Sequence, residues 1–178
     1  MMGPLLRFNL YLFVLCALLC GSLGCKTTES TKKKKKDKEA TTMRFHLEVN
    51  PDGTPWNAPV PIYREKPVMV NVYKQPFLDE GNIASASVVD TVGGFAIKVQ
   101  FDQHGSLALD QATTLHRGQR IAVYSQFTDA RWLAAPQIKG RISNGELIFT
   151  PDATRDEANR IVLGLNNVAQ ELRKKYTW

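Results

Sequence analysis

The stretch TRDEANRIVLGLNNVAQELRKKY, residues 154–176, decides the fold of this chain. Thr154 stands three residues before Glu157, which is the spacing of a capping box at the start of a helix. Cationic residues 173–175 stand where the negative end of the helix dipole favours them. A helix with one apolar face must bury it against other secondary structure, so this segment predicts a layered domain. The apolar face consists of Ala158, Ile161, Val162, Leu165, Ala169, Leu172 and Tyr176.

The segments before this helix alternate between apolar and polar residues, as half-buried strands do. His46 falls on the polar face of the first of them. The predicted strands are residues 43–50, 68–75, 95–102, 120–127, 132–142 and 145–151.

Gly164 costs about 1 kcal/mol relative to alanine inside a helix, and its presence predicts that the last helix packs closely against the sheet.

A second helix is predicted in GSLALDQATTLHRG, residues 105–118. Ser106 is its expected N-cap and Gly118 its expected C′ residue. Its predicted inward face carries Leu109, Ala112 and Leu115.

Two further segments have weaker patterns. Asn82 is placed to cap a helical turn with Ile83, Ala86 and Val89 facing inward. Residues 51–67 hold five prolines and one glycine, which predicts a loop or a run of turns. The elements together predict an α+β domain, a mostly antiparallel sheet with two helices packed on one face, spanning residues 43–178.

The N-terminus, MMGPLLRFNLYLFVLCALLCGSLGC, has the layout of a secretory signal peptide over residues 1–24. One positive charge precedes an apolar run, and small residues precede a cysteine. Its end resembles a bacterial lipobox, although Ser22 stands where such boxes usually have leucine. We therefore predict that a lipid on Cys25 anchors the chain to a membrane of the bacterial cell envelope. The domain is expected to face the periplasm or the cell exterior.

Two alternatives to this anchor remain open. The apolar run is short for a hydrocarbon core of about 30 Å, but a plain membrane-spanning anchor is the competing interpretation. Lysines 32–36 favour retention on the cytoplasmic side, which would make the chain a cytoplasm-facing scaffold. Residues 25–42 are too polar to bury a core and predict a disordered tether. Its lysines either bind anionic lipid headgroups or form a solvated spacer.

The net charge of +6 comes mostly from this tether. Residues 40–178 hold fifteen Lys and Arg against fourteen Asp and Glu, a balance of +1. No basic surface for phosphates is expected there, so we predict no nucleic-acid partner. All three cysteines lie at or before Cys25, which leaves the predicted domain without a disulfide.

The patterns that carry catalytic chemistry are missing from the sequence. His46, His104 and His116 have no second ligand at metal-site spacing, so we predict no metal. Ser125 lacks the Gly-x-Ser-x-Gly setting of a nucleophile. We predict no catalytic residue, cofactor or small-molecule substrate. The alternative is an enzyme with an unrecognised site.

An ordered series of residues within 94–165 resembles the periplasmic head of the protein-translocase subunit SecD and of fused SecDF. The series comprises Phe101, Gly105, Ala112, Thr113, Gly118, Ile121, Ala122, Ala135, Pro136, Ile138, Ile142, Gly145, Glu157, Ala158 and Leu165. This resemblance implies a ferredoxin-like domain and a protein partner, either translocase or an exported polypeptide. Residues 125–129 replace the family's Asp-Gly hairpin, and the family's proton-coupled membrane helices have no counterpart here.

Three residues in WLAAPQIKGRI are candidates for partner binding: Trp132, Pro136 and Ile138. Residues 133–142 predict an edge strand because Pro136 donates no hydrogen bond. An open edge accepts another chain by β-augmentation, but a proline also protects an edge from pairing. Trp132 fits either a partner anchor or core packing. The residues alone do not separate these interpretations.

Overall fold

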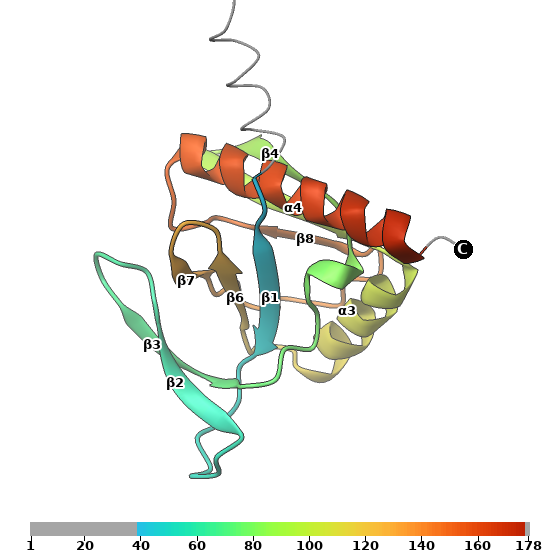
Figure 1. Ribbon diagram of the computed structural model, residues 1–178. Coiled ribbons are helices and arrows are strands. Elements are labelled where there is room, and N and C mark those ends of the chain that lie inside the picture. The colour runs from blue at the N-terminus through green and yellow to red at the C-terminus, as the bar shows by residue number, and fades with distance from the viewer. Residues whose placement is uncertain (1–38, 177–178) are drawn as a thin grey trace, which may run out of the picture. The chain divides into compact units, whose positions relative to one another are not determined.

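The computed structural model describes residues 39–176 (Figure 1), so the predicted signal peptide, Cys25 and most of the predicted tether lie outside the described residues. The folded unit includes residues 39–42, which the sequence assigned to the tether. Thr41 is buried, and the side-chain amide of Asn167 donates to the carbonyl of Glu39 over 2.9 Å. Among these residues, no helix has both the length and the apolar character needed to cross a bilayer.

The strands form three antiparallel sheets with the orders β1-β6-β7, β4-β5-β8 and β2-β3. Together with two α-helices they confirm the α+β class. The strands are β1 (Thr42–Leu47), β2 (Asn57–Ile62), β3 (Val68–Tyr73), β4 (Ile83–Thr91), β5 (Gly94–Phe101), β6 (Ile121–Gln126), β7 (Ala130–Ala134) and β8 (Glu146–Phe149). The helices are α3 (Gln103–Leu115), α4 (Arg155–Tyr176) and a short 3-10 helix, η2 (Glu80–Asn82).

The main core lies between the two helices and the inner faces of the three-stranded sheets. The predicted helix at the C-terminus is confirmed as α4, and the hydroxyl of Thr154 accepts from the backbone N–H of Glu157 over 3.2 Å. Its face of Ala158, Ile161 and Leu165 is almost completely buried. Because α4 contacts β4 and β5 of one sheet and β1 of another, its burial joins the two sheets.

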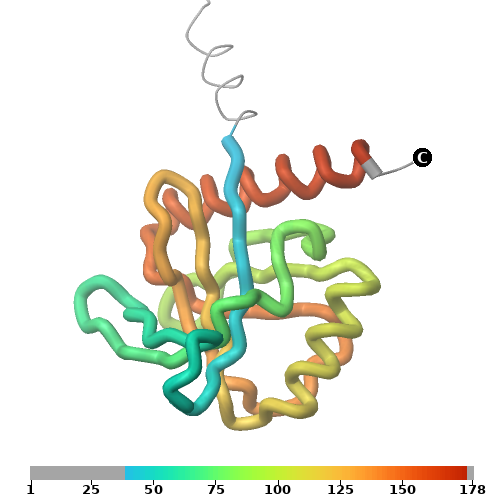
Figure 2. The backbone as a smooth tube through the Cα atoms, turned by 60° about the horizontal axis from the view of Figure 1, so that its bottom comes forward, coloured from blue at the N-terminus to red at the C-terminus, as the bar shows by residue number. Residues whose placement is uncertain are grey.

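Gly164 lies close to Thr41, the residue before the first strand. A Cβ built on Gly164 would lie 2.9 Å from the backbone nitrogen of Thr41 and against the Thr41 hydroxyl. Figure 2 shows the first described residues, in blue, passing α4, in red. The close packing expected at Gly164 is therefore confirmed, and it explains a glycine inside a helix.

Replacing Gly164 with alanine is expected to lower the free energy of unfolding. Helix propensity favours alanine by about 1 kcal/mol, but the new methyl group overpacks against backbone, which typically costs 1–3 kcal/mol. We expect a net loss of up to about 2 kcal/mol in urea unfolding followed by circular dichroism. The control is Gly140→Ala, because a Cβ at Gly140 meets no atom within 4 Å. Equal or greater stability of Gly164→Ala would contradict the close contact.

The β2-β3 hairpin corrects the prediction that residues 51–67 are only loop and turns. Pro59 and Pro61 carry no N–H, yet both lie within β2, opposite Asn71 and Met69 of β3. Alternate residues of the hairpin pack on the back of β6 and on residues after β7, forming a second, smaller core. It consists of Ile62, Val70, Val72, Ala122 and Ala135, with Val60 and Trp132 beside it.

His46 belongs to this second core, not to a solvated polar face as predicted. Its side chain is buried, its Nδ1 lies 2.8 Å from the carbonyl oxygen of Tyr73, and its ring is 5.0 Å from that of Trp132. Burial lowers the pKa of His46 below its ordinary value, the hydrogen bond to Tyr73 opposes this shift, and the charge of Arg44 adds to it. The hairpin covers the strand face that alternation alone assigns to solvent.

This lowered pKa predicts a loss of stability in mild acid. Between the ordinary value of about 6.5 and the lower value in the fold, the unfolded chain binds a proton that the folded chain does not. The free energy of unfolding should therefore fall as pH drops below about 6.5, by at most about 1.4 kcal/mol per pH unit. Urea unfolding from pH 7 to pH 5 measures this slope. His46→Gln should flatten it, whereas His104→Gln, on an exposed position of α3, should not.

Three local predictions about helices are corrected. Asp102 is the N-cap of α3, since its carboxylate accepts from the backbone N–H of Gly105 over 2.7 Å. Ser106 lies inside the first turn instead. Leu115 is 70% exposed, because α3 ends there. The helical turn expected from Asn82 is only η2, capped by Asp79, and the β-branched residues that follow form β4 through pairing with β5.

Candidate functional site

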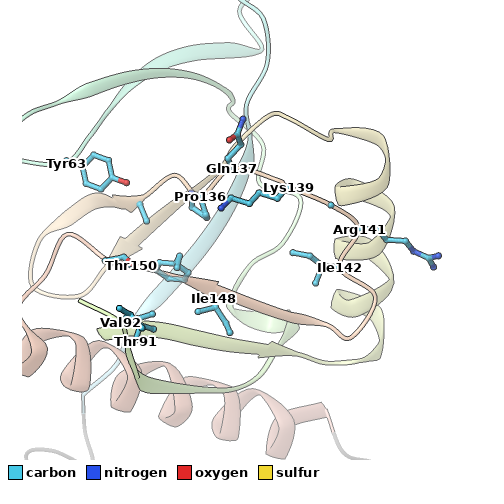
Figure 3. A pocket seen from close by; sticks show the side chains of 14 residues that line it. Tyr63, Thr91, Val92, Pro136, Gln137, Lys139, Arg141, Ile142, Ile148 and Thr150 are labelled. Atoms are coloured by element: carbon cyan, nitrogen blue, oxygen red, sulfur yellow. The ribbon is translucent and has the colours of Figure 1, made fainter. Parts of the chain in front are cut away.

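A groove of about 780 Å³ lies beside β8, opposite the segment of residues 136–142 (Figure 3). The groove is continued by the tip of the β4-β5 hairpin at Val92 and by the turn of the β2-β3 hairpin at Tyr63. This volume lies within the range of about 300–1,000 Å³ that is usual for ligand sites. The side chains used in the argument below are Tyr63, Val92, Pro136, Lys139, Ile142 and Ile148.

The groove forms because β7 and β8 separate after one contact. The backbone N–H of Asp152, three residues after β8, donates to the carbonyl of Leu133 in β7 over 2.7 Å. Beyond this point the chain leaves β7, and the carbonyl of Pro136 accepts from the backbone N–H of Ile121 over 3.0 Å. Ile138 then donates to Gln119 over 2.8 Å. The chain after β7 therefore follows β6, and a gap opens beside β8.

Tyr63 stands at one end of the groove in a strained conformation. Among the described residues it is the only non-glycine with a positive φ, 69°, in a region that L-residues rarely adopt. The next residue holds it there: the backbone N–H of Arg64 donates to the carboxylate of Asp152 over 2.9 Å. The turn of the hairpin is thus tied to the chain just after β8.

A second arginine completes this attachment. The guanidinium of Arg131 donates to the backbone carbonyl of Asp152 and pairs with Glu157 near the start of α4. Arg64 also lies 3.9 Å from Glu157. The two arginines and two carboxylates thus link β7, the hairpin turn and α4 at this end of the groove.

The charge that lines the groove is positive. Lys139 makes no ion pair with any residue that the structure describes. Arg141 points away toward α3 (Figure 3) and pairs with Asp110, and this hydrogen bond lowers the pKa of the Asp110 carboxyl. The lining includes no Asp or Glu, so the groove favours an acidic or neutral group near Lys139.

The lining is suited to binding. It contains no His, Cys, Asp or Glu, so no side chain there can act as a carboxylate or imidazole base. Among residues 39–176, no three His, Cys, Asp or Glu side chains gather in a way that could hold a metal ion. The apolar side chains of the groove lining, among them Ile148, which is 50% exposed, offer apolar surface to a partner.

A second hollow, of about 570 Å³, lies between η2 and the end of α4. Two of its carboxylates are already used as helix caps. Asp79 accepts from the backbone N–H of Gly81 over 2.8 Å, and Asp102 caps α3. Because these groups serve the local fold, the groove beside β8 is the stronger candidate.

The structure separates the three residues that the sequence proposed for partner binding. Pro136 lines the groove. Ile138 is 3% exposed and belongs to the main core. Trp132 packs edge-on against His46 and Tyr124, with ring centroids 5.0 and 5.2 Å apart. The predicted strand at 132–142 is really two pieces, β7 and a segment paired with the residues before β6.

The remaining groove residues were missed by sequence reasoning. Alternation in ELIF, residues 146–149, does place Ile148 on the outer face of its strand, and this was the available signal. Tyr63 and Lys139 carry no comparable signal, because they stand in connecting segments. Their position depends on contacts with distant parts of the chain.

Residues 59–169 match the family described as SecDF, P1 head subdomain. The chain belongs to this family. The match covers β3 to β8, α3 and most of α4 but not β1, and it confirms the resemblance to the SecD and SecDF head. No curated protein shows significant sequence similarity to this chain.

Solved structures share the fold of the P1 head seen here. One is described as SecDF, a membrane component that enhances protein export; it has a TM-score of 0.56 and 18% identity over 82% of this chain and 70% of its own. Another is SecDF in a Super-membrane-facing form, with a TM-score of 0.55 and 18% identity over 81% of this chain. The match spans only 21% of that second protein's length.

Proposed function

We propose that this chain is a membrane-anchored, non-catalytic domain that binds protein during export, and that the groove beside β8 holds a segment of exported polypeptide. The groove itself is the observation that carries the proposal: its lining is mixed, partly apolar and without a carboxylate or imidazole. Such a surface binds side chains of many kinds without reacting with them. The description of a structural relative as a component that enhances protein export supports the same role.

The attachment of the hairpin turn at one end of the groove favours this function on physical grounds. Tyr63 is held by the contacts of Arg64 with Asp152, so the groove does not need to be ordered when a partner arrives. Less conformational entropy is then lost on binding. An unfolded partner still loses its own entropy, which favours weak and reversible contact. Transient binding is what a chain in transit requires.

The anchor is proposed from the sequence alone. A lipid on Cys25 would hold the domain at a membrane of the bacterial envelope, on its periplasmic or outer side. The 13 residues from 26 to 38 reach at most about 45 Å when fully extended. The groove would then remain near the membrane surface, where exported chains emerge.

Binding through the groove predicts a specific loss in Ile148→Ser. The probe is a reduced and carboxymethylated globular protein, which stays unfolded, labelled with a fluorophore. Its affinity for the full chain in detergent micelles is measured by fluorescence anisotropy. Burying the exposed half of an isoleucine side chain is worth about 1 kcal/mol, so we expect roughly fivefold weaker binding.

The matched control is Leu107→Ser, since Leu107 is also exposed, at 63%, but lies on α3 outside the groove lining. Both variants change an exposed aliphatic side chain to serine, so the fold should tolerate both. Equal affinities of the two variants would place binding elsewhere. Absence of binding by the unaltered chain would remove the proposed function.

Lipidation predicts that cells fed a radiolabelled fatty acid incorporate label into the chain at Cys25. In the Cys25→Ser variant the label should be lost and the chain should leave the membrane fraction. Persistent label in that variant would contradict the lipobox. Loss of label without export, shown by protection from protease added to spheroplasts, would support the cytoplasm-facing alternative.

A further inference from the structure

We propose that the groove receives its polypeptide as an extended strand that pairs with the free edge of β8. This inference rests on the proposed function and specifies how the groove would bind. It follows from the way the edges of β1, β2 and β4 are protected, from the direction of two backbone groups, and from the charge of Lys139.

The edge of β2 lacks donors. Pro59 and Pro61 have no N–H, and in an antiparallel ladder proline is tolerated only where its nitrogen faces away from the partner strand. Because residues 58, 60 and 62 alternate with them, those residues face β3. The outer edge of β2 therefore offers carbonyls without N–H groups at two successive positions, and it cannot form a normal ladder.

The edge of β4 is covered by a side chain that makes the two backbone hydrogen bonds that a neighbouring strand would make. The amide of Asn166 on α4 accepts from the backbone N–H of Ala86 over 2.8 Å and donates to its carbonyl over 2.9 Å. The edge of β1 is covered similarly at Phe45, which exchanges backbone hydrogen bonds with Phe77 and Leu78, both of 2.9 Å. Each of these edges is occupied near its middle.

The edge of β8 has no such cover. The backbone N–H of Phe101 donates to the carbonyl of Gly145, so this pair is hydrogen-bonded and the pairs 99↔147 and 97↔149 follow the same pattern. Ile148, opposite Lys98, then lies in a non-hydrogen-bonded pair. Its N–H and C=O must point away from β5, toward the groove, and neither has a partner among residues 39–176.

The opposite wall of the groove also has a residue, Gln137, whose backbone N–H and C=O are not used in a strand ladder. The bonds from Ile121 to Pro136 and from Ile138 to Gln119 place Gln137 in a non-hydrogen-bonded pair with Arg120. The backbone N–H and C=O of Gln137 therefore point away from β6. Figure 3 shows Gln137 and Ile148 on the two sides of the groove. Exposed backbone donors and acceptors beside a groove are best satisfied by the backbone of an extended chain.

The charge of the groove indicates which segments bind best. Lys139 lines the groove and the lining has no carboxylate. Arg141 forms an ion pair with Asp110. An extended segment with an acidic side chain opposite Lys139 complements this surface. We therefore assign the site to an extended polypeptide with an acidic residue among apolar and small polar ones.

The test uses a fluorescein-labelled decapeptide of alternating threonine and valine with one central aspartate. Its affinity is compared for the full chain, Ile148→Ala and Ile148→Pro. Both variants lose the isoleucine side chain, but only proline removes the N–H that the strand would use. Proline is tolerated there because that N–H is not part of the β5 ladder. We expect Ile148→Pro to bind about threefold to tenfold more weakly than Ile148→Ala.

Hydrogen exchange of the Ile148 amide in the unaltered chain, measured by NMR, decides the pairing without a substitution. Saturating peptide should slow this exchange at least tenfold. Peptide that binds without slowing it would overturn strand pairing and leave the proposed function intact. Absence of peptide binding and of unfolded-protein binding would overturn both. A peptide with lysine in place of aspartate should bind about threefold more weakly; tighter binding would overturn the charge assignment.

Discussion

The burial of the apolar face of α4 on strands from two separate sheets is the constraint on which the structure depends. Ile161 and Leu165 belong to one core with residues of β1, β5 and β8. Gly164 lets the helix approach Thr41 closely. Because α4 joins the sheets through their inner faces, β7 and β8 do not need to be hydrogen-bonded along their length. One bond between Asp152 and Leu133 is sufficient, and the gap beyond it is the groove.

The same arrangement explains why the groove is suited to recognition. One end is held by the ion pairs of Arg64 and Arg131 with Asp152 and Glu157, which are anchored in turn to α4. The two walls belong to different sheets, and each turns unpaired backbone groups outward. If an extended chain pairs with these groups as we propose, the surface would recognise the main chain of its partner more than its sequence. That is a useful property in a family whose structural relative is described as enhancing protein export.

Local patterns predicted much of the fold correctly. The C-terminal helix has a long, regular apolar period with a capping residue, and β5 alternates over its whole length, so both were found. The pattern was weaker where short-range signals compete. Asp102 and Ser106 are both good N-caps, and only the end of β5 decides between them. Prolines in β2 suggested a loop because pairing with β3 and packing on β6 cannot be seen in a local window.

Of the three residues that the sequence proposed for partner binding, Pro136 lines the groove, Ile138 is buried in the main core, and Trp132 is half-buried beside the second core. Composition and periodicity predicted the α+β class and the near-neutral domain, and an ordered series of residues carried the resemblance to the SecDF head. The groove could be found only in the tertiary structure. Tyr63 and Ile148 are far apart in the chain and line one groove because the hydrogen bond from Arg64 to Asp152 ties the hairpin turn to the chain after β8. The direction of the Ile148 backbone depends on its register with β5, which the residues of β8 alone do not determine.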